Sequence, residues 1–208
     1  MISRNNNSLG FTAVEVIISV SVGILLMLVA ADLLVSVVSN PTSQMASLDS
    51  IEQAKTVVSV FVDELRSSAV GNDGSYPVTL AQENEIIFYS KFRTTGNAVN
   101  RVRYYFSDGV LYKGTTIPTG LPLSYDLDSE VVRPVVTNVL NQGSPAFYYY
   151  DGNYNGSGQE LSQPVNINQI RFAKINLIME NLTSKQSQST FPISGGAAIR
   201  NLKDNLGN

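Results

Sequence analysis

The sequence predicts an α+β protein in which one long N-terminal helix packs on a head built from an antiparallel β-sheet. Three observations predict this fold class. An apolar run follows the first residues, a stretch with helical spacing of apolar side chains comes next, and segments with strand-like composition fill the rest of the chain. The helix is expected to have a membrane half and an amphipathic half, and the extracytoplasmic head is expected over residues 39–208.

The composition narrows the function before any motif is considered. The 208 residues include no cysteine and no histidine, and the net charge is −3. Disulfides, thiol nucleophiles, Cys/His metal sites and a Ser-His-Asp triad are therefore excluded. The chain has no basic excess for a phosphate backbone, so direct nucleic-acid binding is not expected. No spacing among the other titratable residues indicates catalysis, and we expect a protein that is not an enzyme.

The N-terminal part combines a polar start with an apolar stretch of membrane length. Residues 1–10 carry one charged side chain, Arg4, and with the amino terminus they form a weakly positive segment that would stay on the cytoplasmic side. Residues 11–38 would be about 42 Å long as a helix, which exceeds a hydrocarbon core of ~30 Å. Residues 16–31 carry no charge, so Glu15 and Asp32 are expected near opposite faces of the membrane.

Glu15 is the unusual residue of this stretch. A carboxylate that faces lipid costs roughly 2.5–3.5 kcal/mol near mid-bilayer and less toward the interface. An ionisable residue in a membrane segment is therefore a functional candidate whose partner has to be identified. A cut between Gly10 and Phe11 would create an α-amine that supplies the opposite charge, from the same chain or from a neighbour. The alternative is a tolerated glutamate at the membrane interface.

The segment Gly10-Phe11-Thr12-Ala13-Val14-Glu15 before an apolar helix resembles the class III signal of type IV prepilins and pseudopilins. The resemblance implies that a prepilin peptidase removes the leader, residues 1–10, and that the new terminal Phe11 is N-methylated. It also implies that Glu15 forms an ion pair with the Phe11 amine of a neighbouring subunit and so sets the axial register during assembly. Tip subunits of that family tend to lack this glutamate, which disfavours the terminal cap position.

A conventional signal peptide is the competing interpretation. Val29-Ala30-Ala31 before Asp32 has the small residues of a signal-peptidase site. On that interpretation the chain is a secreted binding domain that begins at Asp32, or a membrane-anchored domain if the segment is not cleaved. A standard signal excludes charge from its apolar region, so Glu15 disfavours this alternative.

The helix is predicted to continue in a second, amphipathic half. Asn40-Pro41 should break or kink it near Pro41, because proline removes a backbone hydrogen bond and restricts the preceding residue. Over residues 42–70 apolar side chains recur with 3/4 spacing, which predicts a helix that packs one face on the head. The apolar positions are Met45, Leu48, Ile51, Ala54, Val58, Phe61, Leu65 and Ala69. The glycines and turn residues of 71–74 end the helix.

The remaining sequence is typical of an antiparallel meander. Strands are predicted over residues 85–92, 99–106, 110–113, 146–150, 165–179 and 190–202. Residues 130–140 are compatible with a strand or a short helix, because Pro134 disfavours both. Asp108-Gly109 predicts a tight hairpin turn. In the strand before it, Val102, Tyr104 and Phe106 share one face, and Arg101, Arg103 and Tyr105 share the other.

Four strand segments resemble one branch of the same family, the J-type minor pseudopilins and W-type minor pilins. They are residues 85–90, residues 103–106 together with 109–112, residues 147–151 and residues 199–202. The resemblance implies a minor structural subunit of a pilus or pseudopilus that serves secretion, DNA uptake, adhesion or motility. Its implied partners are other pilin or pseudopilin subunits, the prepilin peptidase, an inner-membrane assembly platform and membrane lipid. The implied location is the cytoplasmic membrane, single-pass with the head outside, and then a cell-surface pilus or a periplasmic pseudopilus.

A second candidate site lies in the loop that begins at Asp151. Asp151, Asn153 and Asn155 stand at positions 1, 3 and 5 of a calcium loop, and Gly156 stands at the turn position 6. Position 12, which needs a glutamate, is Ser162. Asp, Asn and Gly also form plain turns between strands. The plain turn is favoured, calcium is kept as the alternative, and no cofactor is required.

Overall fold

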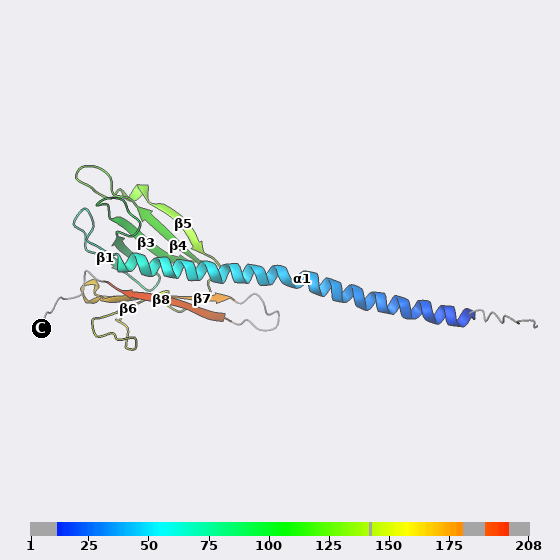
Figure 1. Ribbon diagram of the computed structural model, residues 1–208. Coiled ribbons are helices and arrows are strands. Elements are labelled where there is room, and N and C mark those ends of the chain that lie inside the picture. Colours follow the sequence, from blue (N-terminus) through cyan, green and yellow to red (C-terminus); the bar gives the residue numbers. More distant parts are fainter. Residues whose placement is uncertain (1–11, 142, 181–189, 200–208) are drawn as a thin grey trace, which may run out of the picture. The chain divides into compact units, whose positions relative to one another are not determined.

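The computed structural model describes residues 12–141, 143–180 and 190–199, except for the side chains of residues 36–49 and 180. The chain divides into two compact units, Met1–Met45 and Ala46–Asn208. Each unit is described by itself. The long helix contributes to both units, whereas all the described strands lie in the second (Figure 1).

Helix α1 spans Ala13–Arg66. Thr12 stands directly before it and acts as its N-cap, because the backbone N–H of Glu15 donates to Thr12 Oγ1 at 3.3 Å. The Thr12 hydroxyl in turn lies 3.5 Å from Glu15 Oε2. A threonine followed three residues later by a glutamate is the sequence of a capping box. Thr12 and Glu15, which form this first turn of α1, also belong to the segment Gly10–Glu15 that resembles the class III signal.

The break predicted near Pro41 is wrong, because α1 is one helix from Ala13 to Arg66; the kink, given as the other possibility, stays a prediction. Proline removes a single N–H donor from a helix interior, and the residues on both sides of Pro41 are helical. Pro41 is also the one strong helix breaker in this region of the sequence, since no glycine occurs between Gly23 and Gly71. A single unfavourable residue is outweighed by more than ten turns of helix-forming sequence.

The first unit consists, in its described part, of the beginning of α1. The segment Ala13–Val35 has a mean hydropathy of 2.5 and is long and apolar enough to cross a membrane. Its two central serines do not need outside partners, since Ser19 Oγ and Ser21 Oγ each donate to a backbone carbonyl four residues earlier at 2.8 Å. This segment is a membrane anchor or a signal.

The second unit contains two antiparallel sheets (Figure 1). The first sheet has five strands in chain order: β1 Val78–Ala81, β2 Glu85–Ser90, β3 Asn100–Ser107, β4 Val110–Thr116 and β5 Val131–Val136. The second sheet has three, also in chain order: β6 Phe147–Tyr150, β7 Phe172–Glu180 and β8 Thr190–Ala198. Two short 3-10 helices, η1 Leu127–Ser129 and η2 Ile167–Gln169, precede β5 and β7. The predicted α+β class with antiparallel strands is confirmed.

Some details of the prediction change, and one alternative is settled. The strands form two sheets rather than one meander, and β1 was not predicted. The strand expected from residue 165 begins at Phe172, because Asn166 caps the 3-10 turn η2 with its side chain. α1 ends at Arg66 rather than near residue 70, because the backbone then joins the sheet, where Ala69 N donates to Tyr89 O at 3.0 Å. Within residues 130–140, where a strand or a short helix was expected, Val131–Val136 form the strand β5 with Pro134 inside it.

The core of the second unit forms where α1 meets both sheets. Ala54, Val58, Phe61 and Leu65 are buried at the predicted 3/4 positions, whereas Met45 and Leu48 lie outside the described side chains. The ring of Phe61 lies 5.3 Å from that of Tyr104 in the first sheet and 5.9 Å from that of Phe147 in the second. Burial of this face supplies most of the attraction between the helix and the sheets.

The hairpin between β3 and β4 has the predicted turn. Ser107 pairs with Val110, and the two residues between them, Asp108 and Gly109, have φ angles of 51° and 77°. Positive φ at both central positions matches a type I′ turn, which asparagine, aspartate and glycine tolerate best. This turn fixes the register of β3, and of the three side chains predicted to share one face, Val102 and Tyr104 are buried and Phe106 is half-buried.

Candidate functional site

The predicted cleavage residues Gly10 and Phe11 lie outside the described residues, and the ion pair and methylation assigned to this region stay predictions. Glu15 is described and exposed, in the first turn of α1. An acidic residue is common in the first turn of a helix, beside the positive end of the helix dipole. Within the described residues, neither Glu15 nor Asp32 takes part in an ion pair.

The first unit presents an apolar surface on every side. Fifteen large apolar side chains between Val14 and Val35 are exposed, each by at least 49%. An isolated helix of this kind is not stable in water, because no face of it is covered. Lipid tails or other apolar helices are the environments that can cover such a surface.

The head contains a buried charged cluster that the sequence did not predict. Glu64 of α1 is 5% exposed, and its carboxylate accepts a hydrogen bond of 2.6 Å from Tyr104 Oη and pairs with Lys113 Nζ. Ser90 Oγ donates to the backbone oxygen of Glu64 at 2.7 Å. Burial, and then the charge of Glu64, raise the pKa of Tyr104 well above its ordinary value. The cluster attaches the helix to three strands of the first sheet.

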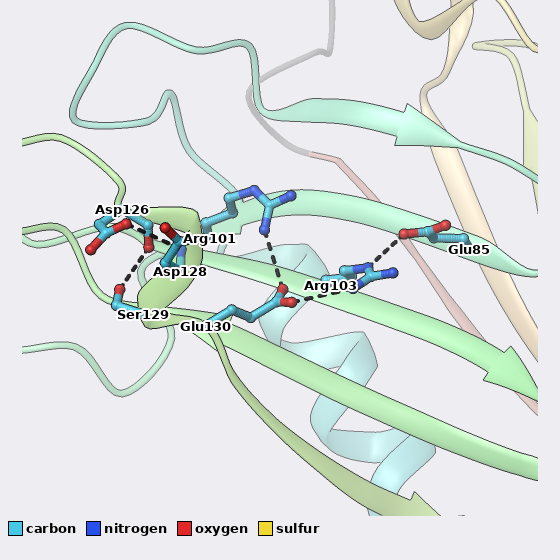
Figure 2. A network of polar contacts seen from close by, with 7 residues as sticks. All are labelled: Glu85, Arg101, Arg103, Asp126, Asp128, Ser129 and Glu130. Carbon is cyan, nitrogen blue, oxygen red and sulfur yellow. Dashed lines mark hydrogen bonds and ion pairs between the residues drawn. The ribbon is translucent and has the colours of Figure 1, made fainter.

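A second charged network lies on the opposite face of that sheet (Figure 2). Glu130 accepts from Arg101 Nη1 and from Arg103 Nη1, each at 3.2 Å, and Arg103 Nε donates to Glu85 Oε1 at 2.6 Å. Burial alone would lower the pKa of Arg103, but the hydrogen bonds and charges of Glu85 and Glu130 raise it. Gly114 makes room for this network, since a Cβ there would stand 2.5 Å from Glu130 Oε1.

The short helix η1 places Glu130 in this network. Asp126 Oδ1 accepts from the backbone N–H of Asp128 at 3.1 Å, and Ser129 Oγ donates to the Asp126 carbonyl at 2.6 Å (Figure 2). These bonds close the turn that leads into β5. The sequence signal was an aspartate followed by serine, which is typical of such turns, but the partners of Glu130 lie in β3 and could not be identified locally.

The loop at Asp151 forms consecutive side-chain turns. Asp151 accepts from the backbone N–H and from the side-chain amide of Asn153, at 2.9 and 3.1 Å. Asn155 Oδ1 accepts from the backbone and hydroxyl of Ser157, at 3.3 and 3.2 Å. In the part of the chain that the structure describes, no group of three or more His, Cys, Asp or Glu side chains is placed to hold a metal ion. The turn accounts for these contacts, and calcium binding at Asp151, Asn153 and Asn155 stays a prediction.

No protein-family model matches the chain, and no curated protein matches it. The class of protein is defined here by its fold and its exposed surfaces. It is a protein with an N-terminal apolar helix that serves as a membrane anchor or a signal, followed by an α+β head in which the helix continues against antiparallel sheets. This combination is consistent with a pilin-like fold.

Proposed function

We propose that this chain is a minor type IV pilin or pseudopilin, a structural subunit without catalytic activity. The observation that carries the proposal is the helix α1, in which an apolar segment exposed on all sides is continuous with a segment that packs on the head. Such a helix joins a folded head to a surface that only lipid or other helices can cover. The resemblance of the segment around Gly10, Phe11 and Glu15 to the class III signal supports the choice of the type IV pilin family.

The proposed mechanism follows from the environment of the apolar segment. In the precursor, membrane lipid covers Ala13–Val35, and the head is exported. After a prepilin peptidase cuts between Gly10 and Phe11, the same surface packs against the helices of other subunits. The carboxylate of Glu15, held beside Thr12 in the precursor, then pairs with the new amine of a neighbouring Phe11. Partner subunits, an assembly platform and a pilus or pseudopilus as destination belong to this proposal.

Mass spectrometry of the amino terminus of the mature protein tests the proposal. The expected terminus is N-methylated Phe11, and cells that lack prepilin peptidase should retain Met1. A terminus at Asp32 would replace the proposal with a secreted binding domain. A chain that keeps Met1 in the presence of the peptidase would leave an uncleaved membrane anchor, which also contradicts the pilin assignment.

A further inference from the structure

Helix α1 covers the first sheet unevenly. On the face toward α1, Phe88 of β2 and Tyr104 of β3 are buried. On β4 and β5 the same face carries Lys113, which reaches Glu64 of the helix, and its direct strand partner Arg133. Thr115 and Val131 form the next pair along these strands on this face. Arg133 is exposed and Val131 is 54% exposed, so α1 leaves the β4–β5 side of the face open.

A hollow of about 210 Å³ lies where this open face meets the helix. Its lining includes Val60, Glu64, Phe92, Arg93, Lys113 and Thr115. We call this hollow, together with the adjoining Val131 and Arg133, the β4–β5 groove. Its walls combine apolar side chains with three cations and one carboxylate.

The groove has uncompensated positive charge. Lys113 and Arg133 are directly opposite each other on neighbouring strands, an arrangement that is destabilising for like charges. Glu64 neutralises Lys113, but among the described residues no carboxylate pairs with Arg133 or Arg93. Arg93 has a φ of 53°, which is uncommon for a residue other than glycine. An anion in the groove would relieve the repulsion at Arg133.

The loop that joins β4 to β5, residues 117–130, has the complementary surface. It exposes apolar side chains, with Leu121 99% and Leu127 60% exposed, beside the exposed carboxylates of Asp126 and Asp128. Tyr125 anchors the loop, because its hydroxyl donates to Val99 O at 2.6 Å and accepts from Asn72 N at 3.0 Å. An anchored loop loses little conformational entropy on binding.

We propose that this loop of one copy binds in the β4–β5 groove of a second copy. Leu127 and Leu121 would pack against the apolar wall that includes Val131, and Asp126 and Asp128 would meet Arg93 and Arg133. Each copy carries both the loop and the groove, and the two adjoin each other in the sequence. In the proposed pair, the loop of each head binds the groove of the other. Such a symmetric pair is a closed assembly that leaves no loop or groove free for a third copy. Chains that share one membrane meet at a raised effective concentration. The contact goes beyond the proposed function and does not depend on cleavage after Gly10.

Disulfide trapping in the full chain tests the contact, and the absence of native cysteine makes every cross-link attributable. Two differently tagged copies are expressed together in membranes, one with Leu127→Cys and one with Val131→Cys, and mild oxidation is followed by detection of the mixed dimer. The matched control replaces Leu127→Cys with Ser157→Cys, an exposed position between β6 and β7. We expect the groove pair to cross-link at least tenfold more than the control pair. Equal yields would overturn the proposal.

Charge exchange identifies the recognition chemistry. Arg133→Glu in the Val131→Cys copy should reduce the cross-link at least fivefold, and Asp128→Lys in the Leu127→Cys copy should restore it. Loss without restoration would overturn the charge pairing.

Leu121→Asn tests the apolar part of the contact. This substitution cannot disturb folding through lost burial, because Leu121 is 99% exposed. Placed in the Leu127→Cys copy, it should lower the yield of the mixed disulfide dimer. An unchanged yield would contradict the apolar part of the contact. A negative cross-linking result would not change the expected N-methylated Phe11 terminus, so the two proposals can be tested independently.

Discussion

The two ends of α1 have the same backbone conformation and opposite surfaces. From Ala13 to Val35 every side chain is exposed and nearly all are apolar. In the second unit apolar side chains such as Phe61 and Leu65 are fully buried on one face, while Gln53 and Ser59 are exposed on the other. A continuous apolar surface needs lipid or several neighbouring helices, whereas a single apolar stripe needs one partner surface.

The carboxylates of the two segments differ in the same way. Glu64 has its partners within the fold, in Tyr104 and Lys113. Glu15 and Asp32 are exposed and have no ion pair among the described residues. Under the proposed function, the partner of Glu15 is the amine that cleavage creates at Phe11 of a neighbouring subunit. The comparison predicts that mutations in the second segment change the stability of the head, and that mutations in the first change assembly.

Phe61→Ala should have the largest effect. The ring is fully buried between both sheets, and truncation of such a residue costs about 3–5 kcal/mol of unfolding free energy. Denaturant unfolding of the full chain in detergent, followed through the tyrosines of the head, measures the loss. The matched control is Ile24→Ala in the apolar segment, which should leave this transition unchanged. Equal losses of unfolding free energy in both variants would contradict the claim that only the second segment of α1 stabilises the head.

Glu64→Ala should have the next largest effect. It leaves Lys113 and the Tyr104 hydroxyl without their carboxylate, and breaking a buried pair costs up to about 3–5 kcal/mol. The Lys113 side chain is 22% exposed and can regain some water, so we expect about 2–3 kcal/mol in the same unfolding experiment. Glu64→Ala combined with Lys113→Met removes both charges and should recover part of the loss. A double variant no more stable than Glu64→Ala would argue against the ion pair as the cause.

Glu15→Ala should leave the head stable and processing intact, because the residue belongs to the first unit rather than to the head and the cleavage residues are unchanged. Under the proposed function it should reduce incorporation into the fibre at least tenfold, which corresponds to about 1.4 kcal/mol or more. Immunodetection of sheared fibres and amino-terminal mass spectrometry measure the two properties. Glu15→Asp retains the charge and should keep part of the incorporation. Normal incorporation of Glu15→Ala would remove the role assigned to this carboxylate.

Tyr149→Phe should have the smallest effect at neutral pH, about 1 kcal/mol for the hydrogen bond from Tyr149 Oη to Gln82 O at 2.8 Å. Burial raises the pKa of Tyr149 well above 10.0. The folded state therefore keeps a proton that the unfolded state loses, so stability falls as pH rises above about 10, by up to ~1.4 kcal/mol per pH unit for this group. Unfolding measured between pH 8 and 12 should be less steep in Tyr149→Phe than in the parent chain. Identical slopes would exclude Tyr149 as a source of alkaline unfolding.

Local signals predicted the elements that depend on neighbours in the sequence. The 3/4 spacing placed Ala54, Val58 and Leu65 in the core, and Asp108-Gly109 placed the hairpin. The break predicted near Pro41 is absent because the long helix around Pro41 outweighs the unfavourable propensity of this one residue. β1 was missed because Val78–Ala81 is only four residues long, too short for alternation to be recognised.

The charged clusters could not be predicted because their members are distant in sequence. Glu64 is separated from Tyr104 by 40 positions and from Lys113 by 49. Glu130 is separated from Arg101 by 29. Such contacts depend on how strands are ordered in the sheet, and no spacing in the sequence encodes that order directly. The division into two sheets was missed for the same reason.

The central position of Phe61 has a consequence for how the head unfolds. One ring packs against Tyr104 of the five-stranded sheet and Phe147 of the three-stranded sheet. The turn between β1 and β2 adds a second connection, because Glu83 O accepts from the backbone N–H groups of Ala146 and Phe147, each at 2.9 Å. Neither sheet can separate from the helix without exposing the core of the other. The head should therefore melt in a single cooperative transition, and no partly folded form with one intact sheet should accumulate.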